Sequence, residues 1–138
     1  FAEIICDNIH VNEQSIKIAK KCITGLYAIT DSINARGLKD GEYTFAKNKI
    51  KKENNSVKIV DSGTLAGSII TMDKTFKNLI KMNFSIQEAV ELTSYNASRY
   101  IGNLNIGEIK TGFSSNFLVL DKKFNLIDVY LEGNKVNE

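Results

Sequence analysis

Residues 2–32 read AEIICDNIHVNEQSIKIAKKCITGLYAITDS, and this segment decides the fold because it holds two short apolar runs that each end in an aspartate. The first run, residues 2–6, stops at Asp7, and the second, residues 26–30, stops at Asp31. Apolar runs of this length are typical of strands buried on both faces of a parallel sheet. Aspartate is a poor strand former and is costly to bury unpaired, so its place at both strand ends needs an explanation.

A helix is predicted between the two runs. Asn12 can cap a helix that continues to about Cys22, with Ile16 and Ala19 on its apolar face. Gly25 is suited to end this helix. The order strand, helix, strand predicts a βαβ unit with parallel strands and a right-handed crossover.

The composition is that of an ordinary globular domain. The chain has 138 residues, 43% of them apolar and 25% charged, which is enough for about one domain. The net charge of +2 is too small to indicate nucleic acid or a membrane surface as partner. No apolar run approaches the roughly 20 residues of a membrane span, and no leader peptide is visible, so we expect a cytoplasmic protein. Because the chain begins at Phe1, we expect it to be part of a longer polypeptide.

The histidine and cysteine content limits the possible metal chemistry. His10 is the only histidine, so a site with several histidine ligands cannot be built from this polypeptide. Cys6 and Cys22 form no CxxC pair and have no nearby histidine partner. We expect two buried thiols in a reducing compartment, with a disulfide or a metal pair as the alternative. No residue of the chain is assigned as a metal ligand.

The middle and the tail are predicted to form two antiparallel meanders with helices between them. Strands are expected at 42–45, 49–52 and 57–60, with turns at 47–48 and 54–55, and again at 106–109, 116–120 and 126–131. Helices are expected after Thr71 and after Ser85, which opens a capping box, and Asn96 is expected to cap a last short helix. The simplest arrangement pairs the two meanders in a small sandwich beside an α/β layer.

Three polar stretches carry the candidate chemistry. Residues 7–10 and 30–32 follow the two predicted parallel strands, and α/β folds bind ligands at the carboxyl ends of such strands. The first stretch could instead close a turn or present ordinary polar surface. The loop 61–68 could be a helix-entry turn or a backbone cradle for a ligand. Asp31 is harder to explain structurally, and its place before a long loop suits an exposed general base.

Motifs in these stretches resemble those of a known family. D-x-x-H-V covers residues 7–11, T-D-S and then G-L-x-D-G-E-Y lie within residues 30–43, and G-T-L-A-G-S-x-x-T-M-D covers residues 63–73. With weaker matches along the tail, these motifs resemble the C-terminal part of the N-acetylglucosamine-6-phosphate deacetylase family, within the amidohydrolase superfamily. The resemblance covers essentially the whole chain.

The resemblance implies an α/β fold that is the C-terminal part of a (β/α)8 amidohydrolase barrel plus part of a small β-sandwich domain. Residues 1–41 would supply the last strands and a helix of the barrel, 42–60 a sandwich meander or an insertion, 61–102 a substrate loop and the closing helices, and 103–138 the C-terminal sandwich strands.

The resemblance also implies an activity, the metal-dependent hydrolysis of the acetamide of N-acetylglucosamine 6-phosphate to glucosamine 6-phosphate and acetate. Asp31 matches the catalytic aspartate, which takes a proton from the activated water and gives it to the leaving amine. The matches to substrate-binding residues are Asp7, Asn8, Ile9 and His10, together with Thr64, Leu65 and Ala66. The divalent metal, zinc or iron, would be held by residues outside this chain, so the chain alone is expected to be inactive. The parent enzyme is expected to be a homodimer.

Two other functions stay open on the sequence. The parent protein could be an amidohydrolase for a different acetamido sugar phosphate or a cyclic amide. The chain could also be a degenerate, non-catalytic binding module. A reading frame that encodes a His-x-His-Gly strand, a Glu and two further His before Phe1 would favour the enzyme.

Overall fold

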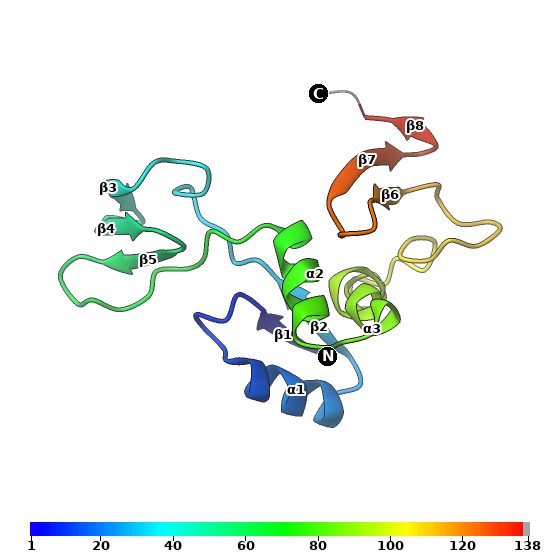
Figure 1. Cartoon of the computed structure of the whole chain (residues 1–138), viewed down its shortest axis with the longest axis horizontal. Helices are drawn as coiled ribbons and strands as arrows, with labels where there is room; N and C mark the ends of the chain where they lie inside the picture. Colours follow the sequence, from blue (N-terminus) through cyan, green and yellow to red (C-terminus); the bar gives the residue numbers. More distant parts are fainter. Residues whose placement is uncertain (137–138) are drawn as a thin grey trace.

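A parallel pair of strands lies near the centre of the molecule, and two antiparallel sheets lie at opposite ends of it (Figure 1). The computed structural model describes residues 1–136. In chain order the elements are β1 (Ala2–Ile5), α1 (Glu13–Cys22), β2 (Leu26–Ile29), β3 (Gly41–Phe45), β4 (Asn48–Glu53), β5 (Ser56–Ile59), α2 (Met72–Lys81), α3 (Ile86–Val90), η1 (Glu91–Tyr95), α4 (Asn96–Tyr100), β6 (Phe117–Leu120), β7 (Leu126–Leu131) and β8 (Asn134–Lys135). The fold is therefore mixed α/β, as expected.

The predicted βαβ unit is confirmed. Strands β1 and β2 pair in parallel, with Ala2 opposite Leu26 and Ile5 opposite Ile29. Helix α1 joins them, and the side chain of Asn12 accepts a hydrogen bond from the backbone of Ser15 at its start. The cap and the apolar spacing therefore produced the predicted helix.

The main hydrophobic core lies between this parallel pair and the helices that pack on it. Ile16 of α1, Leu26 of β2, Leu79 of α2 and Leu92 of η1 are each at most 1% exposed and belong to one cluster. Each buried side chain of this size contributes about 1.5–3 kcal/mol relative to an exposed one. Burial of these four positions therefore ties the helices to β1 and β2.

The helical stretch from Ile86 to Tyr100 is continuous, and the prediction that Asn96 caps a separate helix is wrong. Its first part begins with the predicted capping box, in which Ser85 and Glu88 bond each other reciprocally. The π-helical turn η1 then leads directly into α4. Asn96 lies inside this stretch, and its side-chain amide donates a hydrogen bond of 2.8 Å to the carbonyl of Leu26. The side chain of Asn96 therefore donates to a buried strand carbonyl and does not cap a helix.

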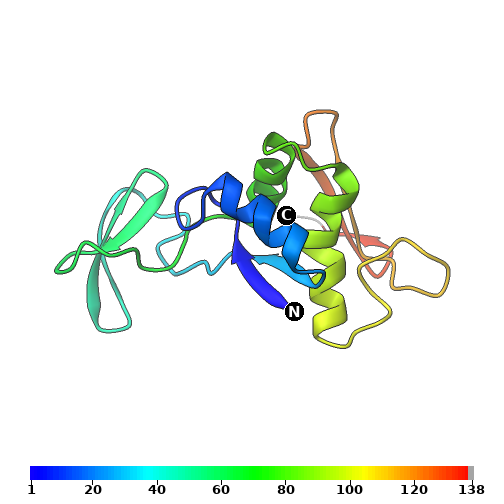
Figure 2. The ribbon, with the colours of Figure 1, turned by 90° about the horizontal axis from the view of Figure 1, so that it is seen from below.

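The two meanders exist, but the prediction that they pair in one sandwich is wrong. Strands β3–β4–β5 form one sheet and β6–β7–β8 another. Figure 2 shows the first of these sheets projecting from one end, away from the helices. It covers its own small core of Ala35, Ile50, Val57 and Ala66.

The second sheet packs against the helical layer instead. Phe124, in the turn between β6 and β7, lies with its ring centroid 5.8 Å from that of Phe76 on α2. Phe117 and Tyr130 stack across the β6–β7 pair at 4.6 Å. The helical layer therefore lies between the two meanders and keeps them apart.

Three smaller predictions also differ from the structure. Residues 106–108 form bends and Ile109 has no regular structure, in place of the predicted strand, and Gly107 lies against the side chain of Ser98. The first hairpin turn lies at 46–47, one residue earlier than predicted, with both residues in the left-handed region. Cys22 is exposed and free, while Cys6 is buried and free as expected. Within residues 1–136, no helix combines the length and the apolar character of a membrane span.

The bond from Asn96 to Leu26 should stabilise the fold measurably. Replacing Asn96 by Ala leaves the Leu26 carbonyl without its side-chain donor, so we expect the free energy of unfolding to fall by about 1–3 kcal/mol. Urea unfolding of the chain, followed by circular dichroism, measures this loss. Asn105→Ala is the control because Asn105 is exposed, and it should change the free energy by less than about 0.5 kcal/mol. Equal losses in the two variants would contradict the assignment.

Candidate active site

The parallel register brings the two strand-end aspartates to the same edge of the sheet. Ile5 and Ile29 are the last paired residues of β1 and β2, and Asp7 and Asp31 each follow two residues later. Neighbouring strands in a sheet lie about 4.8 Å apart. The carboxyl ends of this βαβ unit therefore present two aspartates at one rim.

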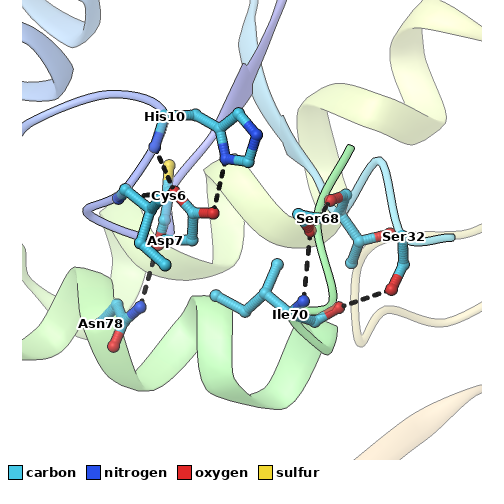
Figure 3. A network of polar contacts seen from close by, with 9 residues as sticks. Cys6, Asp7, His10, Ser32, Ser68, Ile70 and Asn78 are labelled. Carbon is cyan, nitrogen blue, oxygen red and sulfur yellow. Dashed lines mark hydrogen bonds and ion pairs between the residues drawn. The ribbon is translucent and has the colours of Figure 1, made fainter. Parts of the chain in front are cut away.

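The turn after β1 is organised around the carboxylate of Asp7 (Figure 3). One oxygen accepts hydrogen bonds from the backbone N–H groups of Ile9 and His10, both at 2.9 Å. The other lies 2.7 Å from Nδ1 of His10. Asn8 adopts a left-handed φ of 63°, which lets the chain turn this tightly. The side chains of Asp7 and His10 are 5% and 19% exposed, so the pair forms a largely buried hydrogen-bonded unit.

The protonation of Asp7 follows from this arrangement. Burial alone raises the pKa of the Asp7 carboxyl, but the backbone bonds from His10 and Ile9 and the bond to the imidazole lower it by more. The net pKa lies below the ordinary value, so Asp7 is ionised at neutral pH. An ionised Asp7 orients the imidazole and holds its Nδ1 side toward the carboxylate.

The residue before Asp7 supports the turn and takes no part in acid–base chemistry. The carbonyl of Cys6 accepts a hydrogen bond of 3.0 Å from the side chain of Asn78 on α2. Burial, with the nearby charge of Asp7, raises the pKa of the Cys6 thiol to about 12. The thiol therefore stays protonated and unreactive at neutral pH.

Asp31 is exposed at the end of β2, in an unusual backbone conformation. Its φ of 46° lies in the left-handed region, which costs a residue with a Cβ roughly 1 kcal/mol or more. Its carbonyl accepts a hydrogen bond of 2.8 Å from the backbone N–H of Ser68. A loop distant in sequence therefore holds the backbone of this aspartate.

Residues 64–66 extend the β3–β5 sheet. The carbonyl of Thr64 accepts from the backbone N–H of Ile59 at 2.8 Å, and Leu65 forms an antiparallel bridge with Lys58. Ala66 is buried in the small core. In the described part of the chain the hydrogen bonds of these three residues go to β5 and Ser62, and none goes to Asp31 or His10. The structure therefore does not bring this loop into hydrogen-bonding contact with the other candidates.

A positively charged cleft adjoins the Asp7 turn. It has a volume of about 790 Å³ and is lined in part by Asp7, Ile9 and the start of α2. Its cationic lining residues are Arg36, Lys52, Lys74, Lys77 and Lys81. Lys52 is paired with Asp40 at 2.6 Å, and Lys77 donates to the side chain of Asn125 at 2.7 Å. The remaining positive charge makes this cleft suited to an anionic ligand.

Sequence reasoning missed the polar side chains that hold the rim in place. Ser68 and Asn78 bond backbone carbonyls at the ends of β2 and β1, respectively. Ser32 donates to the carbonyl of Ile70 at 3.2 Å (Figure 3). Ser32 and Ser68 lie inside the quoted motifs, and this could have identified them as site residues. Nothing in the sequence marks Asn78.

Residues 1–136 show no cluster of three or more potential metal ligands. Among residues 1–136, no group of three or more His, Cys, Asp or Glu side chains is placed to hold a metal ion. The single histidine is engaged with Asp7 through Nδ1. The described residues therefore offer no preassembled set of three or more metal ligands.

The sequence of the chain is similar over most of its length to curated proteins of one name. The chain is 32% identical over 124 residues to the N-acetylglucosamine-6-phosphate deacetylase of Lysinibacillus sphaericus, covering 88% of this chain and 32% of that relative. It is 28% identical to the enzyme of the same name from Vibrio furnissii, covering 99% of this chain and 35% of that relative. The chain therefore spans about a third of the length of the curated relatives that it matches.

Solved structures give the same result. The crystal structure of N-acetylglucosamine-6-phosphate deacetylase from Thermotoga maritima matches with a TM-score of 0.90 and 32% identity, covering 96% of this chain and 37% of that one. The enzyme from Pasteurella multocida matches with a TM-score of 0.92 over 100% of this chain and 37% of that one, and at 24% identity this likeness shows the fold alone. A model of the amidohydrolase family matches residues 3–136, and the chain belongs to that family.

Proposed function

We propose that the protein to which this chain belongs hydrolyses the acetamide of N-acetylglucosamine 6-phosphate to glucosamine 6-phosphate and acetate. The observation that carries the proposal is the exposed carboxylate of Asp31, held at the carboxyl end of β2 beside the strand that leads into the Asp7–His10 turn. Nearly the whole chain is similar to proteins named N-acetylglucosamine-6-phosphate deacetylase, and this similarity supports the same proposal.

Asp31 is proposed as the catalytic residue. Its carboxylate would accept a proton from the water that attacks the acetamide carbonyl and then donate that proton to the leaving nitrogen. Cleavage of the C–N bond then releases acetate and the free amine. The exposure of Asp31 at the strand end suits proton exchange with a ligand, which a buried carboxyl could not reach.

The amidohydrolase family is generally metal-dependent. The described residues supply no cluster of ligands. We therefore assign any divalent metal, zinc or iron, to residues outside this chain. No step proposed for Asp31 depends on where such ions lie.

The substrate is proposed to contact the turn after β1 and the 64–66 loop. Asp7 preorganises the turn that carries Asn8, Ile9 and His10. The adjoining cationic cleft supports a substrate with a phosphate group, because it places positive charge beside this turn. The motif resemblance is the only support for the proposed substrate role of Thr64, Leu65 and Ala66. The homodimer of the parent enzyme likewise remains a proposal.

The division of the chain is proposed on the same basis. Residues 1–41 and 61–102 would belong to a (β/α)8 barrel, and residues 103–138 to a β-sandwich. The separate β3–β5 sheet supports the interpretation of residues 42–60 as an insertion, because it shares no sheet with β6–β8.

Replacing Asp31 tests the proposed proton transfer. In the complete reading frame that contains this chain, Asp31→Asn should lower kcat on N-acetylglucosamine 6-phosphate by about 10²–10⁴-fold, because the amide cannot exchange the proton. Acetate release measures the rate. Glu132→Gln, which changes an exposed carboxyl in the turn between β7 and β8, should keep kcat within about twofold. An Asp31→Asn enzyme as active as this control would remove the assignment.

The chain alone should be inactive. With Zn²⁺ or Fe²⁺ and N-acetylglucosamine 6-phosphate, the 138-residue chain is expected to release no acetate above background, because its described residues hold no metal cluster. The same assay on the complete reading frame is the positive control. Metal-dependent turnover by the isolated chain would show that the catalytic parts have been misassigned.

The Asp7 turn should make stability depend on pH. Because the folded pKa of Asp7 lies below its ordinary value of 3.8, the carboxylate stabilises the fold above that pH and loses this contribution as the pH falls through the folded pKa. The difference in unfolding free energy between the wild type and Asp7→Asn should be largest near pH 7 and shrink below about pH 4. Urea titrations from pH 7 to pH 2 measure it. Asp61→Asn is the control, and a difference for Asp7→Asn that stays constant with pH would refute the role given to Asp7.

A further inference from the structure

We infer that Ser68 and Gly67 are positioning residues for Asp31, clamping the end of β2 so that its carboxylate points in one direction. The inference rests on the proposed catalytic role of Asp31 and adds two residues that act through it. Neither residue is assigned a contact with substrate.

Ser68 is linked to the end of β2 through both its side chain and its backbone. Its hydroxyl donates to the carbonyl of Thr30, and its N–H donates to the carbonyl of Asp31 at 2.8 Å. Its own carbonyl accepts from the N–H of Ile33 at 3.0 Å. The residue is 3% exposed, so water competes little for these bonds. Backbone groups of Thr30, Asp31 and Ile33 are therefore all hydrogen-bonded to one serine.

The serine is itself held in place. Its hydroxyl oxygen accepts from the N–H of Ile70 at 3.2 Å, and Ser32 donates to the carbonyl of Ile70 at 3.2 Å. Figure 3 shows Ser68, Ser32 and Ile70 as one connected network just before α2. The clamp is therefore anchored to the start of a helix that packs in the main core.

Gly67 allows the loop to approach this closely. A Cβ at position 67 would lie 2.6 Å from Cγ2 of Ile33, 3.0 Å from the backbone oxygen of Asp31 and 3.5 Å from Oδ2 of Asp31. Its φ of 60° also disfavours any side chain. Only glycine at this position leaves room for both the side chain of Ile33 and the backbone of Asp31.

The left-handed conformation of Asp31 explains why a clamp is needed. At a φ of 46°, this residue would relax toward an ordinary conformation if the Ser68 loop, which the Ser68 hydroxyl ties to the carbonyl of Thr30, moved away from it. Such a change turns the Cα–Cβ bond and moves the carboxylate. A displacement of about 1 Å at a catalytic group can cost on the order of 10²-fold in rate.

The test uses kinetics of the complete reading frame that contains this chain. Ser68→Ala should lower kcat on N-acetylglucosamine 6-phosphate by about 10–10²-fold, while KM stays within about threefold, because binding contacts are unchanged. Ser68→Thr keeps the hydroxyl and should restore kcat to within about threefold of wild type. Ser114→Ala, which removes an exposed hydroxyl outside the proposed site, should keep wild-type kcat. Gly67→Ala should also lower kcat.

The possible outcomes distinguish a failure of the proposed function from a failure of the proposed clamp. A wild-type enzyme without activity would refute the proposed function, whereas an active wild type with an equally active Ser68→Ala variant would refute the clamp. Losses of the same size in the Ala and Thr variants would also overturn it, because they would reflect packing. If Ser68→Ala does not fold, Ser68→Cys keeps the size with a weaker donor, and wild-type kcat in that variant would count against the clamp.

A measurement on the chain itself does not require activity. In NMR spectra of Ser68→Ala, the Cα and Cβ shifts of Asp31 should move away from left-handed values, and the N–H of Ile33 should exchange faster than in wild type. Unchanged shifts and exchange rates in a folded variant would overturn the clamp whatever the enzyme assays show.

Discussion

The parallel hydrogen bonding of β1 with β2 is the constraint on which the rest of the structure depends. It places Asp7 and Asp31 at the same rim, since both strands end at the same level. It also creates one face on which α1, α2 and η1 bury their apolar side chains. A shift of one strand by one residue would turn the buried side chains of that strand to the wrong face and displace its aspartate relative to the other one.

Polar side chains from distant segments then complete the ends of this strand pair. Asn96 bonds the carbonyl of Leu26 where β2 begins. Ser68 bonds the carbonyl of Thr30 where β2 ends, and Asn78 does the same for Cys6 after β1. A strand end inside a domain leaves backbone carbonyls without ladder partners, and each such group is costly when buried. These side chains therefore stabilise the sheet and define the rim geometry together.

Electrostatics distinguish the two aspartates. The side chain of Asp7 is largely buried, accepts hydrogen bonds from two backbone N–H groups and pairs with His10, so it is a fixed structural anion. Asp31 is exposed and is held through its backbone, which leaves its carboxylate available to a ligand. The cationic cleft beside the Asp7 turn adds a field that favours an anionic partner. Two identical residue types at equivalent strand ends can thus take a supporting role and a proposed catalytic role.

By itself the sequence determined the local elements: the apolar runs predicted β1 and β2, Asn12 and the Ser85 capping box predicted their helices, and the strand-end aspartates pointed to the rim. These features follow from interactions between near neighbours in the chain. Only the tertiary structure decided that Asn96 serves a strand, that residues 106–109 form no strand, and that the two meanders lie apart. Each of these outcomes depends on contacts between distant segments, where burial and backbone hydrogen bonding override local propensity.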